Sequence, residues 1–133
     1  MNNTFRAQCQ CGQLSVGFAR APVAQLVCHC RDCQEISGLP FTNIAFFKIE
    51  EQCTQGEFKA VDMTGGSGKA KQYRRCSQCN GFVYATVDVL TGLLGVAADK
   101  LEPPFDFSPM AHVWTSEKVP EVEIPSGVFQ FPK

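Results

Sequence analysis

The residues with the clearest chemistry in this chain are its cysteines. There are eight of them, and all but the solitary Cys53 fall into three short groups: Cys9 and Cys11; Cys28, Cys30 and Cys33; and Cys76 and Cys79. Thiolates that are one or two residues apart place two sulfurs on the same side of a metal ion. A single reactive nucleophile would not need this clustering, so the pattern indicates metal binding.

Two of the groups are pairs, and two such pairs complete the sulfur tetrahedron of a structural zinc site. Combining Cys9 and Cys11 with Cys76 and Cys79 would attach the N-terminal segment to a knuckle far along the sequence. A Cys-x-x-Cys pair can also be a redox motif, but redox pairs of the thioredoxin type precede a helix, and no helical pattern follows Cys79. We therefore predict one structural zinc ion bound by these four cysteines.

The middle group differs because Cys28, Cys30 and Cys33 supply three close thiolates and have no obvious fourth partner. Three protein ligands and an open position are typical of a catalytic zinc ion. Such an ion can bind a substrate thiol, lower the pKa of that thiol and polarise a carbonyl group. We therefore predict two zinc ions per chain, the second of them catalytic.

A fourth protein ligand would make the second site structural as well, and the sequence offers three candidates for it. His29 lies between two of the ligands, where we expect its side chain to point away from the metal. His112 lies on an alternating stretch before Trp114, and we expect it to be a packed strand residue. Cys53 is most simply interpreted as a buried free thiol. The sequence leaves this closed-site alternative open.

The compartment follows from the first residues and from the cysteine content. The segment Met1–Arg6 has none of the apolar character of a signal peptide, and no run of about 18 apolar residues that could span a membrane is present. A cysteine-rich chain in a reducing compartment uses its thiolates for metal binding or catalysis rather than for disulfides. We therefore expect a cytoplasmic protein with no membrane partner.

The charge argues against nucleic acid as a partner. The formal net charge is -1 when the thiols are neutral, and loading zinc onto the thiolates would bring it to about -4. The chain has a single basic cluster, formed by Lys69, Lys71, Arg74 and Arg75. We interpret this cluster as the solvated face of a strand.

The elements that must position these cysteines are predicted to be mostly strands. Apolar residues alternate in residues 14–18 and again in residues 82–87, and no long amphipathic helix is present. Residues 41–49 are apolar on both alternations, which predicts an interior strand at the centre of the core. The proline-rich and glycine-rich part from 103 to 133 is expected to wrap the sheet as extended chain and short strands. The length favours one domain over residues 1–133.

The complete motif resembles that of a known family. The sequence reads Cys9-x-Cys11-Gly12, then Cys28-His29-Cys30-x-x-Cys33 followed by Gly38 and Phe41, then Cys76-x-x-Cys79, with His112-Val113-Trp114 later in the chain. This pattern is similar to the glutathione-dependent formaldehyde-activating enzyme family, to which centromere protein V also belongs. The resemblance implies a β-tent, which consists of two packed antiparallel sheets with a zinc knuckle.

The resemblance also implies an activity and a division of labour between the cysteine groups. It places structural zinc on Cys9, Cys11, Cys76 and Cys79, and the catalytic ion on Cys28, Cys30 and Cys33. The family archetype joins glutathione to formaldehyde to give S-hydroxymethylglutathione. The sequence therefore predicts a zinc-dependent carbon–sulfur lyase-type enzyme that acts on a thiol adduct, glutathione-like, of formaldehyde or another small aldehyde. The alternative is a non-enzymatic, zinc-stabilised module that binds a partner protein.

Overall fold

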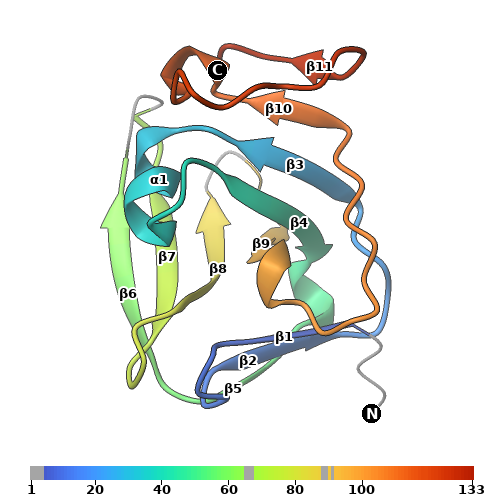
Figure 1. Ribbon diagram of the computed structural model, residues 1–133. Coiled ribbons are helices and arrows are strands. Elements are labelled where there is room, and N and C mark those ends of the chain that lie inside the picture. Colours follow the sequence, from blue (N-terminus) through green and yellow to red (C-terminus); the bar gives the residue numbers. More distant parts are fainter. Residues whose placement is uncertain (1–4, 65–67, 88–89, 91) are drawn as a thin grey trace.

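The computed structural model describes residues 5–64, 68–87, 90 and 92–133, and within them the chain is mostly β with one α-helix (Figure 1). In chain order the elements are β1 (Phe5–Gln8), β2 (Ser15–Phe18), β3 (Ala24–Cys28), α1 (Arg31–Ser37), β4 (Thr42–Lys48), η1 (Ile49–Glu51), β5 (Cys53–Gln55), β6 (Phe58–Met63), β7 (Lys71–Cys76), β8 (Phe82–Val87), β9 (Leu93–Ala97), η4 (Ala98–Lys100), β10 (Ala111–Val113), η5 (Thr115–Glu117) and β11 (Phe129–Gln130). The predicted mostly β fold with little helix is confirmed. None of the helices within the described residues is long and apolar enough to cross a membrane.

The strands form two sheets. The smaller has the order β1-β2-β5, and the larger has the order β11-β10-β3-β4-β9-β8-β7-β6. Every pairing is antiparallel except those of β10, which runs parallel to both β3 and β11. The sheets are therefore antiparallel, as the resemblance implied, except at the edge formed by β10. Residues 101–110 carry the chain along the side of the molecule, so that it enters β10 in the same direction as β3 (Figure 1).

The prediction of a central strand over residues 41–49 is confirmed by β4. This strand pairs with β3 on one side and with β9 on the other. Phe46 and Phe47 point to opposite faces, and both are buried, at 5% and 1% exposed. Phe47 stacks on Phe18 of the small sheet with ring centroids 4.2 Å apart, so β4 joins the packing of the two sheets.

The helix α1 is the main element that the sequence pattern did not predict. It has seven residues, too few for a helical period to stand out. Its first turn is capped by the Cys30 sulfur, which accepts a hydrogen bond from the Cys33 N–H. It ends at Gly38, whose φ of 72° is a left-handed conformation that glycine adopts without strain. The helix α1 therefore begins at a cysteine cap and ends at a glycine, and both are local features of the sequence.

The core is divided into two clusters of buried residues. One joins the small sheet to the large sheet and includes Phe18, Phe47 and Tyr84. The other lies under α1 and contains Cys28, Cys30 and Cys33 together with Tyr73 and Phe82. The middle cysteine group is thus part of the hydrophobic core and not of a surface loop.

Candidate functional site

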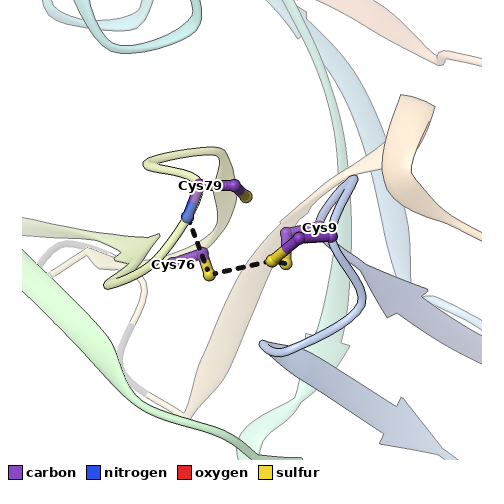
Figure 2. A group of neighbouring side chains, drawn as sticks. Cys9, Cys76 and Cys79 are labelled. Atoms are coloured by element: carbon purple, nitrogen blue, oxygen red, sulfur yellow. Dashed lines mark hydrogen bonds between the residues drawn. The ribbon is translucent and has the colours of Figure 1, made fainter.

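The first cysteine group brings two distant turns together. Cys9 and Cys11 lie in the turn between β1 and β2, while Cys76 ends β7 and Cys79 lies in the turn before β8. The four sulfurs lie within 4.8 Å of one another, and Cys11 Sγ is 3.5 Å from Cys9 Sγ and 3.6 Å from Cys76 Sγ. Figure 2 shows Cys76 and Cys79 on their loop, facing Cys9 on the N-terminal segment.

Backbone N–H groups donate hydrogen bonds to sulfurs of this group, which favours the thiolate form. The N–H of Leu14 donates to Cys9 Sγ at 3.3 Å, and the N–H of Cys79 donates to Cys76 Sγ at 3.4 Å. N–H groups of Cys11 and Gly81 lower the pKa of the Cys79 thiol to about 6. Zn–S bonds of about 2.3 Å in a tetrahedron separate the sulfurs by about 3.8 Å, close to the spacing seen here. The donor set therefore fits a closed metal site of four thiolates.

The second cysteine group is built by one short segment. Cys28 is the last residue of β3, Cys30 caps α1, and Cys33 lies in the first turn of α1. All three are buried, and Cys28 Sγ lies 3.3 Å from Cys30 Sγ. Hydrogen bonds from the Cys28 and Cys33 thiols lower the pKa of Cys30 to about 2, and the Cys33 N–H and the charge of Lys71 add to this effect while burial opposes it. The group fits a metal ion held by three thiolates.

None of the three candidate fourth ligands completes this group within the described part of the chain. His29 Nε2 and His112 Nδ1 are 2.9 Å apart and form a buried hydrogen-bonded pair. Burial lowers the pKa of both rings. As expected, His112 is a packed residue of a strand, β10. Cys53 lies in the small sheet as a free thiol, but it is half-buried and not buried as expected, because β5 is an edge strand.

A cavity of about 130 Å³ lies directly beside the three cysteines. Its walls are mainly apolar and aromatic. They come from six strands, from α1 and from Trp114 after β10, and they include Ile44, Phe46, Phe82, Ala85 and Val113. Cys28, Cys30 and Cys33 form part of the lining. A ligand in this cavity would contact the sulfurs in surroundings that hold little water, where charges interact strongly.

Lys71 is the polar residue of this cavity that the sequence interpretation misplaced. Its ammonium lies 2.8 Å from Asp32 Oδ2 and 4.0 Å from Cys30 Sγ. Its side chain is only 10% exposed and that of Asp32 only 16%. The interpretation of the basic cluster as a solvated strand face is therefore wrong for Lys71, because its strand turns this face toward α1.

Tyr73 lies two residues further along the same face of β7. Its hydroxyl is 3.6 Å from Cys33 Sγ, and it lines the same cavity. Burial, together with the nearby Cys33 and Cys30 charges, raises the pKa of this hydroxyl, which keeps it protonated and able to donate. Residues two apart on a strand point to the same face, so the sequence could have shown that Lys71 and Tyr73 share one face. The sequence alone did not reveal that the cysteines lie on that side.

The comparisons with known proteins agree with this geometry. A family model described as glutathione-dependent formaldehyde-activating enzyme matches residues 4–117, which include every cysteine of both groups. No curated protein sequence gives a significant match. Among solved structures, a Rhodobacter sphaeroides protein from a structural genomics programme superposes with a TM-score of 0.59 at 14% identity, over 75% of this chain and 90% of that one. At that identity the likeness concerns the fold.

Proposed function

Because the chain belongs to the glutathione-dependent formaldehyde-activating enzyme family, we propose that it is a zinc-dependent carbon–sulfur lyase that makes and breaks the bond between a small thiol and formaldehyde or another small aldehyde. The observation that carries this proposal is the cavity whose wall contains three buried thiols next to a buried ammonium group. A structural metal site is closed by four protein ligands and needs no cavity beside it.

In this proposal Cys28, Cys30 and Cys33 hold the reactive zinc ion, and Cys9, Cys11, Cys76 and Cys79 hold a structural one. When bound, the reactive ion stabilises a substrate thiol as the thiolate and acts as a Lewis acid. The apolar walls, Phe46 and Trp114 among them, exclude water from the reacting atoms. At about 130 Å³ the cavity accepts the reacting end of a thiol and a small aldehyde.

Lys71 and Tyr73 supply the donors for the oxygen of the aldehyde. In the forward direction the thiol loses its proton on binding, its sulfur attacks the carbonyl carbon, and the π electron pair moves to the oxygen, which then takes up one proton. No oxidation or reduction occurs. An ammonium has three donors, and Asp32 and Cys30 account for two of those on Lys71. We assign the third, together with the Tyr73 hydroxyl, to the oxygen that becomes negative.

The test is to follow the formation of the hydroxymethyl thioether from formaldehyde and a thiol by exchange NMR. Wild-type protein loaded with zinc should exceed the uncatalysed rate, whereas Cys30→Ser should not. Cys53→Ser is the matched control, because Cys53 is a free thiol in the other sheet, and it should behave like wild type. If fully zinc-loaded wild type neither binds the thiol in calorimetry nor accelerates the reaction, the enzyme proposal fails.

One observation favours a second candidate, a zinc-stabilised module that binds a partner protein. Exposed apolar side chains lie along the β10–β11 edge, with Met110 54% exposed, Phe129 73% and Phe131 46%. Such side chains are common at protein interfaces. A protein that holds both zinc ions and binds no thiol would support this candidate.

A further inference from the structure

The cavity beside the three cysteines is larger than the reacting atoms require. Its volume is about 130 Å³, and an apolar cavity of about 150 Å³ holds benzene, which has six carbon atoms. When a thiol adds to formaldehyde, the reacting sulfur, carbon and oxygen are only three non-hydrogen atoms. About half of the cavity is therefore left for further carbon atoms.

The polar groups of this cavity gather at the sulfurs. The Lys71 ammonium is 4.0 Å from Cys30 Sγ, and the Tyr73 hydroxyl is 3.6 Å from Cys33 Sγ. Beyond these groups and Cys28, the described residues that line the cavity are apolar or aromatic. A polar or charged group placed against that wall would lose its hydrogen bonds to water without replacement. The wall therefore suits a hydrocarbon chain whose polar end lies at the cysteines.

The space along the apolar wall exists because two neighbouring strand positions carry small residues. Ala85 of β8 and Gly95 of β9 are register partners, and both line the cavity. The backbone of Gly95 does not require glycine, since its φ is not positive. An added Cβ would lie 3.1 Å from Phe46 Cε1 and 3.3 Å from Ile44 Cγ2, so both of these cavity residues would have to shift. Gly95 thus lets them lie close to the sheet, which leaves the space above them open.

The aromatic wall at Trp114 is held by an unusual backbone conformation. Trp114 has φ 57° and ψ 37°, in the left-handed region that bulky residues rarely adopt. Strain of this kind persists only where the surrounding structure enforces it, and it is concentrated at functional sites. Here it accompanies an indole ring that lines the cavity and offers an apolar surface to a ligand.

We propose that the aldehyde substrate carries an apolar side chain of about three carbons, as butanal does, and that this chain lies over Ala85 and Gly95. This inference rests on the proposed function and names the class of aldehyde. The carbonyl oxygen lies at Lys71 and Tyr73. The bonding change is the one already given: the carbon–sulfur bond forms, the π electron pair moves to the oxygen, and the oxygen takes up one proton. The alkyl chain keeps all of its bonds and contributes through burial.

The first test needs only wild-type protein loaded with zinc. Exchange NMR with 2-mercaptoethanol compares acetaldehyde, propanal and butanal, whose carbonyl groups are similar, and each rate is corrected for the uncatalysed reaction. Each buried CH₂ should raise kcat/KM about fourfold, which gives about fifteenfold from acetaldehyde to butanal. A flat or falling series, with formaldehyde still turned over, would overturn this inference and leave the proposed function standing. No acceleration with any aldehyde would refute the proposed function itself.

Variants of the wall locate the alkyl chain. Ala85→Leu adds three carbons to the wall and Gly95→Ala adds one, so both narrow the space. The ratio of kcat/KM for butanal to that for formaldehyde should fall about tenfold in Ala85→Leu and by a smaller factor in Gly95→Ala. Ala60→Leu, the same exchange at an exposed position of β6, is the matched control and should keep the wild-type ratio. A wild-type ratio in both cavity variants would contradict the proposed position of the chain.

A binding measurement without turnover completes the test. Trp114 is the only tryptophan of the chain and lines the cavity, so its fluorescence reports binding there. Butanol, which cannot react as an aldehyde, should change the emission of zinc-loaded wild type at about fifteenfold lower concentration than ethanol. Ala85→Leu should remove this difference, whereas Ala60→Leu should retain it. Equal midpoints for the two alcohols in wild type would overturn the inference.

Discussion

Replacing Lys71 with methionine separates a catalytic role for this residue from a structural one. Methionine has similar length and no charge, so Lys71→Met keeps most of the packing in the cavity. The substitution leaves the Asp32 carboxylate, which is 16% exposed, without the ammonium that lies 2.8 Å away. Breaking a fully buried ion pair costs about 3–5 kcal/mol. With this partial exposure we expect the free energy of unfolding to fall by about 2 kcal/mol.

The expected loss of rate is larger than the loss of stability would explain. Removing a single donor to a developing oxyanion lowers kcat by about 10² to 10³-fold. Lys71→Met should therefore retain two zinc ions and bind the thiol, but it should form the hydroxymethyl thioether about a hundredfold more slowly. The measurements are elemental analysis, calorimetry and exchange NMR on the same preparation, with the exposed Lys59 replaced by methionine as the control.

A double variant decides between the two roles. Lys71→Met combined with Asp32→Asn removes both charges, so part of the lost stability should return. The rate should stay low, because the donor to the oxygen is still missing. If the double variant regains the wild-type rate along with its stability, Lys71 acts only by pairing with Asp32. The assignment of Lys71 to the substrate oxygen would then be refuted.

Three further predictions concern the metal groups, the backbone and the histidine pair. Cys76→Ser should unfold or aggregate the chain, because the closed group links two distant turns, whereas Cys33→Ser should give a folded protein with one zinc ion by elemental analysis. Gly56→Ala should cost about 3 kcal/mol or more in urea denaturation, since its φ is 97° and an added Cβ would lie 2.0 Å from a backbone oxygen; Gly92→Ala, with open space around it, should cost only about 1 kcal/mol. Burial lowers the pKa of His112 below 6.5 in the folded protein, so the unfolded chain binds more protons than the folded one as the pH falls. The stability advantage of wild type over His112→Gln should therefore shrink between about pH 7.5 and 5.5. A stability difference that does not change with pH would contradict this assignment.

The group of Cys9, Cys11, Cys76 and Cys79 could be predicted from the spacing of its cysteines alone. A pair such as Cys76 and Cys79 supplies only two of the four ligands of a structural zinc ion, so a second pair must supply the others. This requirement pointed to Cys9 and Cys11 before any strand was placed. The sulfurs indeed gather within 4.8 Å. The strands at residues 14–18 and 82–87 were predictable for a similar reason, since a period of two is a local property of the chain. The strand at residues 41–49 was predictable from a short run that is apolar on both alternations.

The surroundings of the middle cysteines could not be inferred in this way. Lys71 and Asp32 are far apart in the sequence, and their ion pair exists because β7 passes under the first turn of α1. In sequence Lys71 belongs to a basic cluster, and nothing local distinguishes it from Arg74, which faces the opposite side of the sheet and packs on aromatic rings.

The sequence by itself therefore determined which cysteines form the two groups that could hold metal ions, and it determined the mostly β architecture, because these depend on residue types at short, fixed spacing. Only the tertiary structure decided what those donors face. The small apolar cavity and the buried ammonium of Lys71 beside Cys30 both arise where α1 packs on strands from distant parts of the chain. Contacts of this kind depend on the direction and register of whole strands, which no local pattern records.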